Sequence, residues 1–383
     1  MTSAASSECQ EADGSEGLPL VGRPPQATHG TEEMEFFLPE LPRLLPSAYH
    51  PNAVEIEVRS NAWVCRHLQS CFTDEQALLL YLRQRAGLYG AAVSPLADEQ
   101  RAGDIADFYQ YVTVVDDAVA GAATSERQAR TALARIADGF GVDSDDTSPL
   151  VRAGADLWRR ITPGLSPAQV VRFKEGLASS LGGYADEVPH RHAGRVLDLD
   201  SYLALRVFSF GWPFVALMTE YGAEVDMSDL HPTPGFELAN GHAVRQMILV
   251  NDLLSWRKEH ARADTMNAVA VLKHTDSLTL QDAVNALCRL IGNEGRAYLT
   301  ARDRILHSPL GTRPEVITYF SAVDHLIGGT QAYHYLTPRY FGDGYTPDGA
   351  TSGWLSLTEP LARLRPHPAG CPVDAGQRLT TSR

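Results

Sequence analysis

The chain has 383 residues and a formal net charge of −14 at pH 7, from 33 Lys and Arg against 47 Asp and Glu. This acidic balance argues against a nucleic-acid partner, because phosphate backbones are bound by clustered Lys and Arg. An anionic substrate is compatible with it where metal ions supply the positive charge. No run approaches the ~18 apolar residues of a membrane span. Five scattered cysteines without a C-x-x-C pair indicate free thiols in a reducing cytoplasm.

The two ends of the chain differ in composition from its middle. Residues 1–34 are rich in Ser, Gly, Glu and Pro and lack periodicity, which predicts a disordered leader. Three prolines within residues 38–46 exclude a regular helix and predict an apolar strap over the core. Residues 346–383 are rich in Pro, Gly and Thr, and we expect a flexible C-terminal tail there.

Residues 35–345 are expected to form one all-α domain, because apolar residues recur there at helical spacing and no β-alternation exceeds a few residues. Clusters of Gly, Pro, Asp and Ser separate the expected helices. The predicted ranges are 53–69, 73–88, 95–119, 125–140, 150–161, 167–184, 197–220, 235–260, 280–306 and 314–335.

The 235–260 helix carries the most informative stretch, N-D-L-L-S-W-R-K-E at residues 251–259. In a helix, Asn251, Ser255 and Glu259 lie at i, i+4 and i+8 on one face. An amide oxygen, a hydroxyl and a carboxylate form a hard-oxygen ligand set that suits Mg²⁺. A polar stripe on an exposed helix has the same spacing, but the flanking apolar residues argue against solvation all round.

A second acidic element lies near the end of the 95–119 helix. Asp116 and Asp117 follow an apolar face in V-V-D-D-A-V-A-G. Two adjacent carboxylates cost free energy to bury unless they are paired or bound to metal. A solvated helix end is the alternative interpretation.

These two segments resemble the metal-binding motifs of bacterial class I terpene synthases. Residues 251–259 match the second signature, N-D-x-x-S-x-x-K-E, including Asp252 and Lys258. The acidic pair resembles the first, D-D-x-x-D or D-D-x-x-x-E, although Ala120 and Gly121 occupy the two positions of the third acid. The resemblance implies Mg²⁺, three ions in that family, with Mn²⁺ as the alternative metal. The metal ligands that it implies are Asp116, Asp117, Asn251, Ser255 and Glu259.

Two further segments resemble the same family. Arg206, in Y-L-A-L-R, resembles the diphosphate sensor, and the helix break that follows the sensor falls at G-W-P, where Gly211 is expected to supply it. Arg339 and Tyr340 resemble the C-terminal R-Y pair that closes over the diphosphate. Without the rest of the resemblance, Arg206 would be interpreted as one partner of a surface ion pair, and an R-Y dipeptide would carry no information.

Aromatic residues on these helices would line an apolar cavity and stabilise cations by ~0.5–2 kcal/mol each, although most of them are equally compatible with a packed core. The resemblance assigns catalysis to Arg206, Gly211, Arg339 and Tyr340. It assigns substrate binding to Arg206, Lys258, Arg339, Tyr340, Phe108, Phe208 and Trp212.

The resemblance, which covers about residues 36–341, implies a single helical bundle around a central apolar cavity. The implied activity is Mg²⁺-dependent: farnesyl or geranylgeranyl diphosphate is ionised, the carbocation cyclises to a sesqui- or diterpene, and diphosphate leaves. We expect a cytoplasmic enzyme, and homodimers are common in that family. One alternative is a prenyltransferase of the same fold, or a synthase acting on an unusual, for example methylated, prenyl diphosphate. The other is a non-catalytic helical protein that binds prenyl diphosphate. Substrate length and product skeleton are not encoded by motif spacing.

Overall fold

The computed structural model describes residues 34–366 except residues 121, 122, 124 and 141–145. The expected leader up to residue 33, residues 367–383 of the expected tail and the third-acid position Gly121 lie outside the described residues.

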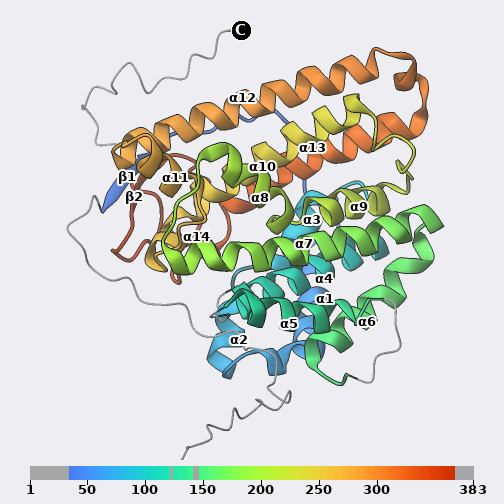
Figure 1. Cartoon of the computed structure of the whole chain (residues 1–383), viewed down its shortest axis with the longest axis horizontal. Helices are drawn as coiled ribbons and strands as arrows, with labels where there is room; N and C mark the ends of the chain where they lie inside the picture. The colour runs from blue at the N-terminus through green and yellow to red at the C-terminus, as the bar shows by residue number, and fades with distance from the viewer. Residues whose placement is uncertain (1–33, 121–122, 124, 141–145, 367–383) are drawn as a thin grey trace, which may run out of the picture.

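Helices dominate the described part (Figure 1). The elements are, in chain order, β1 (Glu35–Leu38), α1 (Ala53–His67), η1 (Gln69–Cys71), α2 (Glu75–Leu82), α3 (Ala86–Val93), α4 (Glu99–Val115), η2 (Asp116–Ala120), α5 (Glu126–Ala137), α6 (Pro149–Ile161), η3 (Thr162–Gly164), α7 (Pro167–Ala193), α8 (Leu199–Ser209), α9 (Trp212–Ala223), α10 (Pro234–Ala261), α11 (Ala268–Thr275), α12 (Leu280–Leu306), η4 (Pro309–Thr312), α13 (Pro314–His334), α14 (Pro338–Phe341) and β2 (Gly353–Ser356).

Most predicted helices are present, and the all-α prediction is confirmed. Side-chain caps begin several of them: Asp98, Ser166 and Thr279 each accept from a backbone N–H in the first turn of α4, α7 and α12. The single helix predicted over residues 73–88 was wrong. It divides into α2 and α3 around Arg85, whose φ of 60° interrupts helical geometry.

The longest central helix, α10, joins the two large hydrophobic cores. Phe236 and Met247, from its first half, are buried in a core shared with α4, α7, α9 and α13. Ile248 and Leu253 are buried in a second core shared with α11, α12 and β1. Because both cores hold α10, the row of polar residues near its C-terminal end is carried by a fixed element (Figure 1).

Part of the expected tail packs on the domain. β2 pairs antiparallel with β1, with Phe36 opposite Leu355. Leu357, Leu361 and Leu364 are buried in the second core. This two-stranded sheet was not predicted from the sequence, because each strand has only four residues and its partner lies more than 300 residues away along the chain.

Within the described residues no single helix is long and apolar enough to span a membrane. The pair α8 and α9 meets that test only when both are taken together, and they are bent by 48° at their junction.

Adjacent glycines in α13 allow close backbone contact on two sides. A Cβ at Gly328 would lie 2.0 Å from the carbonyl oxygen of Pro46, in the strap, which is not helical, as predicted. A Cβ at Gly329 would lie 2.1 Å from the carbonyl oxygen of Ala92, at the end of α3. Helix α13 is therefore held between the strap and α3, and this contact fixes the position of its C-terminal end.

We predict that Gly328→Ala lowers the free energy of unfolding by about 1–3 kcal/mol, because the new methyl group meets backbone that cannot rotate away. Gly182→Ala in α7 is the matched control, since its Cβ would meet nothing within 4 Å. That control should be neutral or gain up to about 1 kcal/mol from helix propensity. Urea unfolding of both variants measures the difference, and equal changes would contradict the proposed contact.

Candidate active site

The three predicted ligand residues on α10 lie one turn apart on one side of the helix. Asn251 contacts side chains from three other elements, as described below. Ser255 is fully buried, and its Oγ makes only a 3.5 Å contact with the carbonyl oxygen of Asp252. Glu259 accepts one hydrogen bond, from Nδ2 of Asn267 at 2.5 Å. The row therefore retains oxygen atoms with free capacity to bind a cation.

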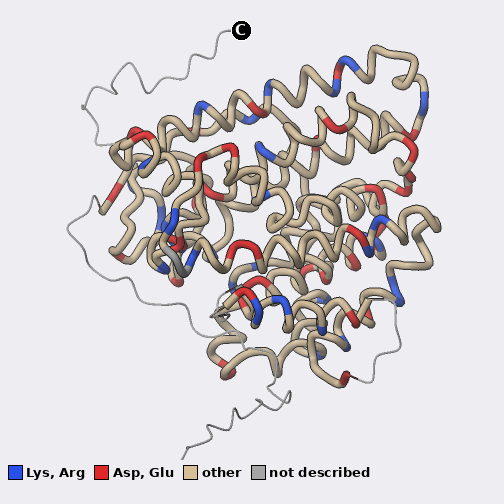
Figure 2. Tube along the Cα trace, in the orientation of Figure 1, with Lys and Arg blue, Asp and Glu red and all other residues tan. Residues whose placement is uncertain are grey.

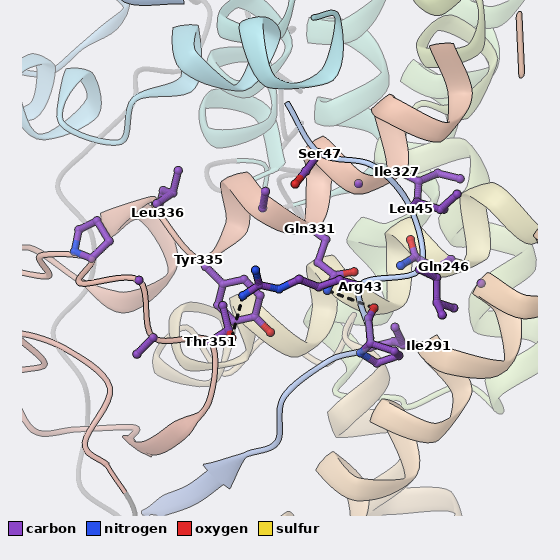
Figure 3. Close-up of a pocket in the computed structure, with 18 of the residues that line it drawn as sticks. Arg43, Leu45, Ser47, Gln246, Ile291, Ile327, Gln331, Tyr335, Leu336 and Thr351 are labelled. Atoms are coloured by element: carbon purple, nitrogen blue, oxygen red, sulfur yellow. Dashed lines mark hydrogen bonds between the residues drawn. The ribbon is translucent and has the colours of Figure 1, made fainter. Parts of the chain in front are cut away.

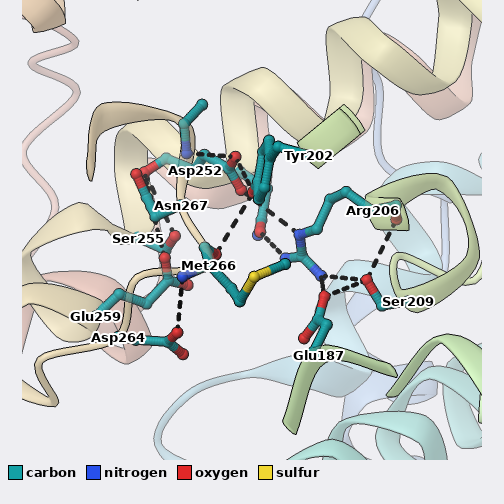
Figure 4. A network of polar contacts seen from close by, with 12 residues as sticks. Glu187, Tyr202, Arg206, Ser209, Asp252, Ser255, Glu259, Asp264, Met266 and Asn267 are labelled. Carbon is teal, nitrogen blue, oxygen red and sulfur yellow. Dashed lines mark hydrogen bonds and ion pairs between the residues drawn. The ribbon is translucent and has the colours of Figure 1, made fainter. Parts of the chain in front are cut away.

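Asp252, next to the first ligand, joins α10 to its surroundings (Figure 4). Its Oδ2 accepts from the hydroxyl of Tyr202 at 2.5 Å and from the backbone N–H of Ala268 at 3.0 Å. Asn267, the N-cap of α11, donates to both the Asp252 carbonyl and Glu259. The motif residue Asp252 and the unpredicted residue Asn267 therefore fix the orientation of the row of predicted ligand residues on α10.

The carboxylates on α10 are not fully neutralised by their neighbours. Burial raises the pKa of Asp252 to about 7, although Arg206 opposes this shift. Burial, assisted by the neighbouring Asp264, also raises the pKa of Glu259. A bound cation would relieve the cost of burying Glu259 as a carboxylate. The donor set therefore fits a hard divalent metal.

Within the described part of the chain, no group of three or more His, Cys, Asp and Glu side chains is placed to hold a metal ion. A metal here would depend on the mixed amide, hydroxyl and carboxylate oxygens of the α10 row.

The acidic pair lies in η2, a π-helical turn that continues α4. The 95–119 prediction missed this change of geometry, which often occurs at functional sites. Asp117 is buried, with its side chain 7% exposed, whereas the side chain of Asp116 is 35% exposed. The two neighbouring acids therefore have different environments, and Asp116 is the accessible one.

Three cations surround the Asp117 carboxylate. Arg339 donates two hydrogen bonds to it, at 2.6 and 3.0 Å. Lys258 Nζ and Arg262 Nη1 lie 3.6 and 3.7 Å from its Oδ1. Burial alone would raise the pKa of Asp117, but the three cations hold it well below its ordinary value. Basic and acidic residues gather near α14 in Figure 2.

Arg206 and Tyr340 reach the same asparagine of the α10 row. Arg206 Nη2 donates to Asn251 Oδ1 at 3.3 Å, and Asn251 Nδ2 donates to the Tyr340 hydroxyl at 3.1 Å. Arg206 also contacts Ser209 and the buried Glu187 of α7, a residue that the sequence analysis did not single out (Figure 4). All four sequence segments therefore meet in one contact network.

Gly211 lies at the break between α8 and α9, as predicted. Its φ is +81°, and a Cβ there would lie 2.1 Å from the ring of Phe214. Glycine is required for both reasons. The break leaves Arg206 in the last turn of α8, where it reaches Asn251.

The three aromatic residues assigned to the substrate have different environments. Phe108 is fully buried and packs against Phe173 and Phe214. Trp212 is partly buried and packs against both cores. Phe208 is 44% exposed. Their assignment to the substrate stays a prediction.

Another ring group adjoins the α10 row and was not predicted. His334 stacks on Tyr340, with ring centroids 4.9 Å apart and planes 12° from parallel. Tyr89 of α3 lies edge-on to His334 and contacts Tyr109 and Tyr333. These rings join α3, α4 and α13 beside Asn251. No local motif marked them, because they come from separate helices.

His334 fixes the orientation of the Asn251 amide. His334 Nδ1 lies 2.6 Å from the carbonyl oxygen of Thr330, which only accepts, so Nδ1 carries the proton. Burial lowers the pKa of His334 to about 4, which leaves Nε2 as an acceptor. Nε2 lies 2.9 Å from Asn251 Nδ2. The amide NH₂ therefore faces His334, and the amide oxygen faces Arg206.

Arg257 anchors the C-terminal segment that carries the R-Y pair. Its guanidinium donates to the carbonyl oxygens of Phe341, Ser356 and Glu359 at 2.6, 2.9 and 3.1 Å. Gly342, with φ of +98°, leaves the space for it, since a Cβ there would lie 2.5 Å from Nη1. Arg257 occupies a variable position of the motif, so this role could not be predicted from the sequence.

Comparisons with known proteins agree with this geometry. The family model described as terpene synthase family 2, C-terminal metal binding, matches residues 107–296. A (3S,6E)-nerolidol synthase of Selaginella moellendorffii is 27% identical over 81% of this chain and 84% of its own. Spiroviolene synthase of Streptomyces violens is 29% identical over 89% and 96%. The crystal structure of the SVS_A2 protein, from ancestral sequence reconstruction, superimposes with a TM-score of 0.70 at 26% identity, covering 78% of this chain and 90% of that one.

We predict that His334→Leu weakens divalent-metal binding by about 10–100-fold, because the Asn251 amide loses the partner that orients it. Mn²⁺ binding in the presence of inorganic diphosphate, followed by electron paramagnetic resonance, measures this loss. His334→Gln should recover part of it, since Oε1 can accept from Asn251.

The matched control is His325→Leu, which removes a histidine from the same helix with the same Nδ1 contact to a carbonyl four residues earlier. Equal Mn²⁺ affinity in the His334→Leu and His325→Leu variants would show that His334 does not orient the ligand.

Proposed function

This chain belongs to the class I terpene synthase family, and from that premise we propose that it uses Mg²⁺ to ionise farnesyl or geranylgeranyl diphosphate and cyclises the resulting carbocation to a sesqui- or diterpene. As a terpene synthase it is a lyase that acts on a prenyl diphosphate and depends on a divalent metal. The supporting observation is that the α10 oxygen row, the acidic pair, Arg206 and the R-Y pair form one contact network.

The metal-binding residues that we propose are Asn251, Ser255 and Glu259 on one side and Asp116 on the other, for three Mg²⁺ ions. When bound, the metal neutralises the diphosphate leaving group and favours cleavage of the carbon–oxygen bond. For Asp117 we propose a role other than the metal ligand expected from the sequence, because its carboxylate is already held by Arg339, Lys258 and Arg262.

Asp117 would hold those cations in place until the substrate arrives. The three cations share a single carboxylate, and burial together with repulsion by Arg339 and Arg262 lowers the pKa of Lys258 to about 8. A diphosphate offers more negative charge than Asp117, and forked guanidinium donors match its oxygens. Arg339 and Lys258 would turn to the leaving group, Arg206 would contact it from α8, and Tyr340 would donate from its hydroxyl. These donors are preorganised for charge that develops during ionisation.

The runner-up is a prenyltransferase of the same fold, or a synthase for an unusual, for example methylated, prenyl diphosphate. It is favoured by the absence of a third acid at positions 120 and 121 of the first motif. One carboxylate fewer alters how the diphosphate is held and leaves room for a different substrate.

The deciding experiment is incubation of the purified full chain with Mg²⁺ and geranyl, farnesyl or geranylgeranyl diphosphate separately. Diphosphate release and gas chromatography–mass spectrometry are read together. A cyclic hydrocarbon or alcohol from farnesyl or geranylgeranyl diphosphate is expected. Product that forms only when isopentenyl diphosphate is added would favour the prenyltransferase. No Mg²⁺-dependent release from any of these substrates by the folded protein would overturn the cyclase proposal.

We predict that Asn251→Ala and Glu259→Ala each lower turnover by about 100-fold or more, because each removes a proposed metal ligand. Glu237→Ala, an exposed residue in the first turn of the same helix, is the control and should keep full activity. Initial rates and thermal unfolding are measured for all three variants. Full turnover by both ligand variants would contradict the metal assignment.

We predict opposite signatures for the two acids of η2. Asp116→Asn should lower turnover without lowering Tm. Asp116 is accessible, and Arg339, the buried cation near it, is also held by Asp117. Asp117→Asn should destabilise the empty protein by about 3–5 kcal/mol, since it leaves buried cations without a countercharge. Mg²⁺ with inorganic diphosphate should recover most of that loss, and Tm measured with and without them tests this. The same response in both variants would contradict the division of roles.

A further inference from the structure

The turn that joins α2 to α3 has a strained backbone conformation that a salt bridge holds in place. Arg85 has φ of +60°, a left-handed geometry that costs a residue other than glycine free energy. Its guanidinium donates two hydrogen bonds to the carboxylate of Glu57 on α1, at 2.9 and 2.7 Å. The turn is therefore fixed to α1, and it presents the preceding residue, Gln84, to the segment that carries the R-Y pair.

The backbone carbonyl of Gln84 accepts two hydrogen bonds from that segment. The hydroxyls of Tyr333 and Thr337 donate to it at 2.9 and 2.7 Å. The Thr337 hydroxyl oxygen in turn accepts from the backbone N–H of Arg339 at 3.1 Å, because Thr337 is the N-cap of α14. Leu336, which precedes Thr337, instead lines a pocket beneath the strap (Figure 3). The first turn of α14 is therefore docked on the turn between α2 and α3.

The side chain of Gln84 reaches the arginine of the R-Y pair directly. Its Oε1 accepts from Arg339 Nη1 at 2.7 Å. Because a guanidinium only donates, the amide must present its oxygen to Arg339. The same Nη1 donates to Asp117 Oδ2 at 2.6 Å, and it carries two N–H groups, one for each acceptor. Arg339 is therefore held by one charged acceptor and one neutral acceptor.

We propose that Gln84 is a positioning residue, which orients Arg339 for the diphosphate leaving group; this inference rests on the function proposed above. When Arg339 turns from Asp117 to the diphosphate, its hydrogen bond to Gln84 can persist, so the guanidinium pivots about Nη1 and stays ordered. Without that bond, the side chain would have to be ordered on binding, which costs affinity. Because glutamine is neutral, it orients Arg339 without competing with the diphosphate for its charge, as a second carboxylate would.

The test measures binding of inorganic diphosphate to the full chain at saturating Mg²⁺, by isothermal titration calorimetry. Gln84→Leu should weaken this binding about tenfold, because Arg339 loses the hydrogen bond that orients it. Gln281→Leu is the matched control, since this glutamine of α12 instead makes two hydrogen bonds to the backbone of Phe37 in β1. The control should lower Tm and leave the diphosphate affinity unchanged. Equal affinity in Gln84→Leu and the wild-type chain would overturn the proposal.

A second variant, Gln84→Glu, keeps the acceptor and adds a negative charge. The cations around Asp117 gain another carboxylate, so Tm of the empty protein should rise. The same carboxylate competes with diphosphate for Arg339, so diphosphate binding should weaken about tenfold. A residue that only supported the fold would leave this affinity unchanged, and that result would overturn the proposal even where Gln84→Leu fails to fold. Absence of diphosphate binding by the wild-type chain would instead contradict the proposed function itself, and this inference with it.

Discussion

The arrangement of the candidate active site depends on one buried carboxylate. Asp117, in η2, holds Lys258 and Arg262 from the C-terminal end of α10 and Arg339 from α14. Without it, three cations would have to be buried close together with no countercharge, which is strongly unfavourable. The same arrangement keeps the cations near the α10 row before an anion is bound. Under the proposed function, a structural ion cluster and a substrate site would therefore use the same side chains.

Helix α10 connects the charged cluster around Asp117 to the rest of the fold. Its two halves are buried in different cores, and its polar row lies at the end that α11, α14 and the C-terminal segment enclose. Asn267 holds Glu259 from α11, and Arg257 binds three carbonyls of the C-terminal segment. The polar residues of α10 are consequently positioned by contacts with segments that are distant in the chain.

Features that depend on residues close together in the chain could be predicted from the sequence, whereas features that depend on contacts between distant residues could not. Helical periodicity placed α10 and α12 well, and the row Asn251, Ser255 and Glu259 was recognisable because its spacing is local. Gly211 was predicted for the same reason. The hydrogen bond that Asn251 donates to His334 spans 83 residues, and the pairing of β1 with β2 spans about 320, so neither leaves a pattern in the sequence. The π-helical turn at Asp116 was also missed, because it depends on packing around α4.

The charge balance of the candidate active site gives a physical interpretation of the missing third acid in the first motif. With Asp117 occupied by three cations, the acidic pair offers one accessible carboxylate, Asp116, and the α10 row offers one more, Glu259. Two carboxylates do not balance the charge of several divalent ions, so the empty protein should bind such ions weakly. A diphosphate supplies the missing negative charge, and linkage then requires each ligand to raise the affinity for the other. Metal and substrate would therefore assemble together, and the substrate would supply the negative charge that a third acid contributes elsewhere.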